Sequence, residues 1–301
     1  MKTLYSLLFV LLLTTGSATG QSLLKPYILG LETTGPVPEI KSKIEAGLQS
    51  QGLKLLGQYQ PGDDMSRWIF VIGSSELEAA VQKTGGLSAF ASAMKIGITS
   101  EGGKTLVSYT NPFYWANAYF QKDYSKVTAH ITAFNKQIEG VMKASGTFAG
   151  TPFGSENGIS GQDLQRYHYM MGMPYFEDTV ELGSFESFTA AVAKIDASAK
   201  KGTPGVKLVY KVSVPGKELC LYGFALGGPN GEAKFLPIID KGNPKHTAFL
   251  PYEVLVIGKE VHMLHGRYRI ALSFPDLTMG TFSKIMSTPG DIEDMLEQLV
   301  K

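Results

Sequence analysis

The chain has 301 residues, of which 44% are hydrophobic and 18% charged, and its formal net charge is +1. These values are typical of a globular protein that buries a core and has room for about two domains. A net charge this close to zero argues against the strongly basic surface on which nucleic-acid binding depends, so we expect no nucleic-acid partner.

Residues 1–20 have the pattern of a secretory signal peptide. Lys2 precedes the apolar run 4–13, and small and polar residues follow up to Gly20. The run is too short for a membrane span, which needs about 20 residues. We therefore expect residues 1–20 to be cleaved. The mature protein would then be exported, to a periplasm or the cell exterior, with no membrane span.

The first half of the remaining chain alternates strand and helix patterns. Apolar residues at helical spacing follow a first strand, and a Gly-Gly turn separates the two strands of a hairpin. Asn111 and Pro112 suit the N-cap and first position of a helix. The predicted elements are a strand at 25–33, a helix around 37–48, strands at 53–60 and 67–73, a helix at 74–83, a hairpin of 91–99 with 104–110, and helices from 112 and over 127–141.

The second half repeats this order after a Gly-, Ser- and Thr-rich stretch, which we interpret as a linker over 144–175. The sequence predicts a strand at 176–183, a helix around 185–195, strands at 206–214 and 219–227, a hairpin of 252–258 with 268–274, a helix after Pro275 and a closing helix through 292–299.

Two segments provide the closest match between the halves. "GKTLVSYTNP" at 103–112 and "GRYRIALSFP" at 266–275 both begin with Gly and carry Pro nine residues later. The shared element order indicates internal duplication. We therefore expect an α+β fold of two related small domains, 21–143 and 176–301, each an antiparallel-rich sheet backed by helices.

The stretch 68–112 resembles the family called domain of unknown function 302 (DUF302). Gly73-Ser74-Ser75-Glu76-Leu77 matches its helix start, and Ser108-Tyr109 with Pro112 matches its later motif. The Leu-Pro pair usual before the hydrophobic strand is missing from the first half and stands at Leu250-Pro251 in the second. The resemblance covers about 27–143 and, more weakly, 176–300.

This resemblance implies a compact α+β domain. It implies no activity, no catalytic residue and no cofactor, because the family motifs are structural. Members of the family associate as dimers, so the resemblance is compatible with a homodimer or with two halves of one chain forming an intramolecular pseudo-dimer.

A dense aromatic cluster follows Asn111 and supplies the candidate binding residues. On a helix from Pro112, Phe113 and Phe120 share a face that suits the core. We expect core packing for the cluster as a whole. The alternatives place Trp115 and Tyr119, which share a neighbouring face, half-exposed at a domain interface or at the rim of a small-molecule pocket. The candidates for such a surface are Tyr109, Asn111, Tyr114, Trp115 and Tyr119.

A second cluster contains soft metal ligands. His168, Met170, Met171 and Met173 lie within six residues of one another. Thioethers and one imidazole suit Cu(I), whereas the alternative is an adaptable apolar bridge into the second domain. We favour no metal at this segment. His262 and His265 are a further weak pair, since residues three apart on a strand face opposite sides, and His130 and His246 are isolated.

No motif for nucleophilic, zinc-dependent or nucleotide-dependent catalysis is present. We therefore expect a non-catalytic ligand-binding or interaction module that uses the groove between its two domains to bind a small molecule or a protein partner. The first alternative is an enzyme of unidentified class, which would need a concave pocket with two titratable groups within hydrogen-bond reach. The second is copper binding by the Met/His segment.

Overall fold

The computed structural model describes residues 23–301. The predicted signal peptide lies outside this range. Within 23–301, no helix is both long enough and apolar enough to cross a membrane. The fold is α+β, as predicted, with helices packed on two antiparallel sheets.

The first sheet has six strands in the order β2-β3-β4-β5-β1-β6. Its central strands are apolar on both faces because helices cover one face and the second half of the chain covers the other. Gly102 and Gly103, both at positive φ, close the β4–β5 hairpin as predicted. The strands are β1 (Tyr27–Thr33), β2 (Lys54–Tyr59), β3 (Arg67–Gly73), β4 (Met94–Glu101), β5 (Lys104–Thr110) and β6 (Thr151–Phe153).

The second sheet has five strands in the order β8-β9-β10-β11-β7, which matches β2-β3-β4-β5-β1 of the first sheet. The two sheets also share an irregularity, because the first pair of strands in each is bulged, at Leu55/Gly57 and at Leu208/Tyr210. The strands are β7 (Val180–Ser184), β8 (Val206–Ser213), β9 (Leu219–Leu226), β10 (Tyr252–Ile257) and β11 (Glu260–Met263).

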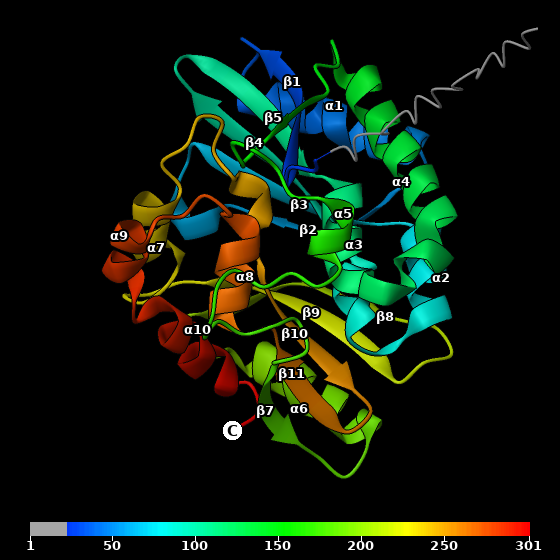
Figure 1. The fold of residues 1–301 in the computed structure, drawn as a ribbon, viewed down its shortest axis with the longest axis vertical. Coiled ribbons are helices and arrows are strands. Elements are labelled where there is room, and N and C mark those ends of the chain that lie inside the picture. Colours follow the sequence, from blue (N-terminus) through cyan, green and yellow to red (C-terminus); the bar gives the residue numbers. More distant parts are fainter. Residues whose placement is uncertain (1–22) are drawn as a thin grey trace, which may run out of the picture.

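Amphipathic helices cover the outer face of each sheet. In Figure 1 the first sheet lies above the second, and α1, α2 and α4 lie together beside the first sheet, while α6 packs on β8, β10 and β11. The helices are α1 (Val37–Ser50), α2 (Ser75–Thr84), α3 (Pro112–Phe120), α4 (Tyr124–Ser145), α5 (Gly161–Leu164), α6 (Phe188–Lys201), α7 (Glu232–Ile239), α8 (Gly266–Ser273), α9 (Met279–Phe282) and α10 (Thr288–Glu297).

The two halves interlock through reciprocal short 3₁₀ segments. The first half's η2 (Gly86–Ser92) packs on β9 and β10, and the second half's η4 (Thr247–Phe249) packs on β3, β4 and β5. Gly97 of β4 makes this approach feasible, since a Cβ there would stand 2.9 Å from the backbone nitrogen of Ala248. The buried apolar residues of both halves accordingly form one continuous core.

Buried ion pairs cross between the halves. Lys95 of β4 donates from Nζ to Glu253 Oε1 of β10 at 2.5 Å, and Tyr210 OH donates to the same oxygen at 2.6 Å. Arg269 of α8 lies 3.5 Å from the other Glu253 oxygen. Buried charges need such partners, and Lys95 and Glu253 supply them for each other across the contact between the halves.

The segment 268–274 is not a strand, and this corrects the predicted hairpin. Gly258, at φ 54, closes the turn so early that β11 occupies 260–263 as the partner of β10. Residues 266–273 then form α8, whose N-cap is His265: its Nδ1 accepts from Arg267 N at 3.2 Å. α8 is buried nearly all round, so its sequence carries no helical period that would distinguish it from a strand.

Three smaller differences concern the linker, the match between the halves and the end of the last helix. The linker contains β6, which pairs with β1, and the short helix α5. The match between 103–112 and 266–275 is wrong as an alignment, because the first segment is mostly the strand β5 and the second mostly the helix α8. The closing helix α10 ends at Glu297, so Leu299 is buried beyond its end.

Candidate functional site

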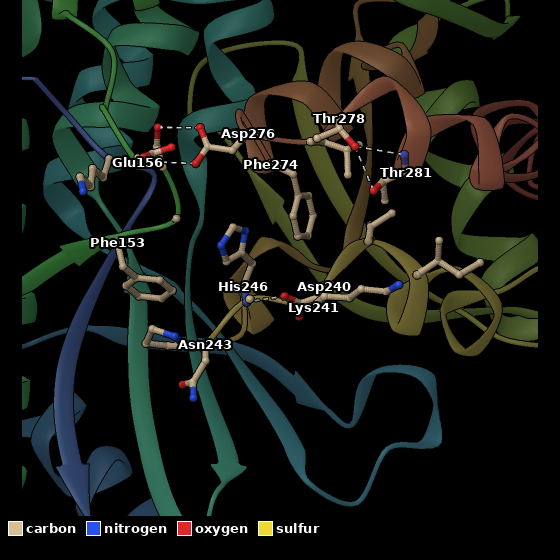
Figure 2. Close-up of a pocket in the computed structure, with 18 of the residues that line it drawn as sticks. Phe153, Glu156, Asp240, Lys241, Asn243, His246, Phe274, Asp276, Thr278 and Thr281 are labelled. Carbon is tan, nitrogen blue, oxygen red and sulfur yellow. Dashed lines mark hydrogen bonds between the residues drawn. The ribbon is translucent and has the colours of Figure 1, made fainter.

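A cavity of about 430 Å³ lies where the two halves meet. Three segments form it: 152–156 from the end of the first half, 238–246 after α7, and 274–281 after α8. Figure 2 shows the His246 ring between Phe153 and Phe274, with Asp276 and Glu156 on one side and Asp240 with Lys241 on another. The volume falls in the range of about 300–1,000 Å³ that is usual for small-molecule sites.

His246 is the central side chain of this cavity. Its ring stacks on Phe274 with centroids 4.7 Å apart, and contacts Tyr27 at 4.8 Å and the edge of Phe153 at 5.8 Å. Burial lowers the pKa of His246 below 6.5, and the nearby carboxylates of Asp240 and Asp276 only partly oppose this effect. The imidazole is therefore neutral at pH 7.

The hydrogen bonding of His246 defines its tautomer. Nδ1 lies 3.2 Å from the carbonyl oxygen of Ser273, which can only accept, so Nδ1 carries the proton. Nε2 is then an acceptor. It lies 3.9 Å from the point where a Cβ on Gly242 would stand, and Gly242 itself lines the cavity. The ring therefore presents a lone pair on the cavity side.

The charged groups around the cavity differ in whether they already have hydrogen-bond or ion-pair partners. The buried Asp240 carboxylate pairs with Arg67 and accepts from the backbone nitrogen of His246 at 2.8 Å. Asp276 accepts from Glu156 N at 2.6 Å and from Ser155 Oγ at 3.2 Å, which joins two walls of the cavity. Lys25 and Lys241 also line it, and within residues 23–301 neither forms an ion pair. The cavity thus has a rigid aromatic wall and a mixed polar rim.

The five predicted binding residues lie together but outside this cavity. All are at most 5% exposed, so the alternative in which Trp115 and Tyr119 are half-exposed is wrong. Tyr119 stacks on Phe176 with centroids 5.4 Å apart. Tyr114 OH donates to Leu272 O at 2.9 Å, and Arg269 Cζ lies 5.3 Å from the Trp115 ring. The second half of the chain covers a face of α3 that would be exposed to solvent in an isolated first domain.

Tyr109 and Asn111 have local roles at the start of α3. Tyr109 is buried in β5 opposite Ile96. Asn111 is the N-cap, accepting from Phe113 N at 3.1 Å while its amide donates to Lys25 O at 2.8 Å. Phe113, predicted as core, is only partly buried. Whether any of the five candidates binds a partner stays a prediction.

The Met/His segment forms a turn next to α9. His168 Nε2 lies 2.8 Å from the carbonyl oxygen of Met173, and its ring stacks on Tyr175 at 4.1 Å. Met171 is 97% exposed, whereas Met170 and Met173 line a small groove together with Met279. The structure thus separates the four residues predicted as one cluster.

The remaining candidate groups have structural partners. His262 Nδ1 lies 3.2 Å from Thr179 Oγ1, whereas His265 caps α8. Burial raises the pKa of the Cys220 thiol, which contacts Ser213 Oγ at 3.3 Å. Among the residues described, no three His, Cys, Asp or Glu side chains come close enough together to hold a metal ion.

A second cleft between the halves, of about 710 Å³, contains a pair of titratable groups within hydrogen-bond reach. Tyr59 OH donates to Glu232 Oε1 at 3.0 Å. The same carboxylate accepts from Gly62 N at 3.0 Å and from Leu226 N at 3.1 Å. Both Glu232 oxygens therefore already have hydrogen-bond partners within the protein. These contacts join the η1 segment (Pro61–Asp63) of the first half to α7 of the second.

No motif in the sequence singles out His246. Its ring partners Tyr27, Phe153 and Phe274 come from distant segments, and only Asn243 and Pro244 nearby indicated a loop. A site assembled from three loops of two halves has no local motif.

No protein-family model matches the sequence, and no curated protein is similar to it. Among solved structures, the chain is similar to the crystal structure of an uncharacterized conserved protein, DUF302, from Bacillus stearothermophilus. The TM-score is 0.36 and the sequence identity 15%. The match covers 40% of this chain and 98% of that chain. The structural neighbour thus carries the family name that the 68–112 stretch resembles.

Proposed function

We propose that this chain is an exported, non-catalytic binding protein, built by tandem duplication, whose ligand occupies the cavity around His246. The observation that carries the proposal is this cavity, which Lys25 and the linker line on one side and the second half on the other, and which combines an aromatic wall with an imidazole acceptor. Sites for small molecules are mostly apolar with a few placed polar groups. The matching strand orders support duplication, and residues 1–20 support export.

The cavity chemistry defines the class of ligand. The aromatic wall of Phe153, His246 and Phe274 favours a planar ring that packs against it from the cavity. An N–H or O–H group on that ring would donate to His246 Nε2, because Nδ1 already donates to Ser273 O. The rim lysines, Lys25 and Lys241, would donate hydrogen bonds to anionic or hydrogen-bond-accepting substituents.

Indole and 1-methylindole test this class, because they differ in the one N–H donor. We expect indole to bind about tenfold more tightly, since an unsatisfied buried acceptor costs on the order of 1–3 kcal/mol. His246→Phe keeps an aromatic ring and removes the acceptor, so it should abolish the difference. Isothermal titration calorimetry measures both compounds on both proteins. Equal affinities on the unaltered protein would contradict the assignment of His246 Nε2.

Gly242→Leu tests whether the compounds enter this cavity. A Cβ at this position meets only Pro244 O at 3.5 Å and His246 Nε2 at 3.9 Å, so the larger side chain fills the cavity without displacing the backbone. We expect indole binding to be lost while the melting temperature stays near that of the unaltered chain. The matched control is Gly290→Leu in α10, where nothing lies within 4 Å. Unchanged binding in Gly242→Leu would place the indole elsewhere.

A further inference from the structure

The groove beside the Met/His segment is lined by three methionines from two distant parts of the chain. Met170 and Met173 come from the turn before β7, and Met279 comes from the first position of α9. The other lining residues are Tyr169, Arg267, Ile270, Ala271, Leu277 and Phe282. No acidic side chain, imidazole or thiol is among the residues that line it.

Local backbone geometry explains why two of the methionines lie together. Met173 N donates to Met170 O at 3.0 Å, which closes a β-turn, and Gly172 at φ 83 supplies the left-handed position. The two ends of such a turn lie within about 7 Å of each other. Met171, at the turn's second position, points to solvent instead and is 97% exposed.

The size and chemistry of the groove select the kind of ligand. Its volume of about 40 Å³ exceeds the roughly 10–15 Å³ that a site needs to hold one water, so a single ion fits in it. Neutral thioethers are soft ligands, whereas Mg²⁺, Ca²⁺ and Zn²⁺ need carboxylate, imidazole or thiolate donors. The Arg267 charge at the rim repels any cation, and a divalent ion about twice as strongly as a monovalent one.

We propose that Met170, Met173 and Met279 form a binding site for a soft monovalent cation, Cu(I) or its analogue Ag(I). The ligands of this site differ from those of the copper site that the Met/His segment alone would predict. It excludes Met171, and it excludes His168, whose ring contacts Met173 O and Tyr175. It includes Met279, which lies 106 residues after Met173 in the chain. None of its methionines lines the cavity around His246, although Leu277 contributes to both.

Anaerobic competition against bicinchoninate measures the affinity for Cu(I). We expect one equivalent to bind, and Met173→Leu and Met279→Leu each to weaken binding at least about tenfold, since loss of even an outer partner of a metal ligand costs 10–100-fold. Leu conserves volume, so the fold should be retained. Met171→Leu and Met286→Leu are matched controls on exposed methionines and should leave the affinity unchanged.

Titration of protein labelled at the methionine methyl carbons with Ag(I) identifies the ligands directly. Resonances of Met170, Met173 and Met279 should shift together at one equivalent, while those of Met171 and Met286 stay in place. Absence of binding, or a Met279→Leu variant that binds as tightly as the unaltered chain, would overturn the proposal. Equal losses in Met171→Leu and Met173→Leu would also overturn it, because residues 170–173 alone would then be the ligand.

Discussion

Replacing Glu253 with Ala should lower the free energy of unfolding by about 3–5 kcal/mol, because it leaves buried cations without their partner. Glu253 is 4% exposed and contacts Lys95 at 2.5 Å and Arg269 at 3.5 Å. Urea unfolding followed by tryptophan fluorescence measures the change. A loss below about 1 kcal/mol, the value of an exposed ion pair, would contradict the ionic contact between the halves.

Two matched variants separate charge burial from loss of packing. Lys95→Met combined with Glu253→Leu removes one charge of each sign, so it should be more stable than Glu253→Ala alone. Glu39→Ala removes an exposed pair with Lys43 at 2.7 Å and should cost at most about 1 kcal/mol.

Glu232→Gln should remove a pH dependence of stability between pH 5 and 8. Burial raises the pKa of Glu232 from its ordinary value of 4.5 to about 7, against the opposing effect of its three hydrogen bonds. Between these values the folded chain holds a proton that the unfolded chain has released. The stabilisation is therefore complete below pH 4.5 and is lost as the pH rises through 7.

We expect the unaltered chain to lose about 2–3 kcal/mol more than Glu232→Gln between pH 5 and 8, from the shift of the Glu232 pKa. Chemical denaturation at both pH values measures the difference between the two proteins, in which the other titrations cancel. Glu181→Gln, at an exposed position on β7, is the control and should follow the unaltered chain. Parallel pH profiles for the unaltered chain and Glu232→Gln would contradict burial of an ionisable Glu232.

Most elements were predictable because their signals are local. Asn111 and Pro112 open α3, and the apolar stripe from Val127 to Val141 defines α4. α8 was not predictable as a helix, since the surrounding sheets and helices bury its residues on nearly every side. Arg269 in its middle carries a charge that becomes acceptable in the core through partners from other segments, the Glu253 carboxylate and the carbonyl oxygens of Phe249 and Pro251.

The contacts between the halves limited prediction of the site. A half-exposed surface was an alternative for Trp115 and Tyr119 because helical spacing within one domain leaves their face uncovered. Phe176, Arg269 and Leu272 of the second half cover that helix. His246 lies in a loop without periodicity, and its aromatic partners come from three distant segments.

Ring-carbon NMR of the five histidines during an indole titration tests the proposed site most directly. His246 is the one histidine that lines the cavity, whereas His130, His168, His262 and His265 lie outside it. The expected result is a shift confined to His246, without protonation of its ring at pH 7. Binding of indole that leaves the His246 signals unchanged, or no binding at all, would contradict the assignment of the cavity as the ligand site.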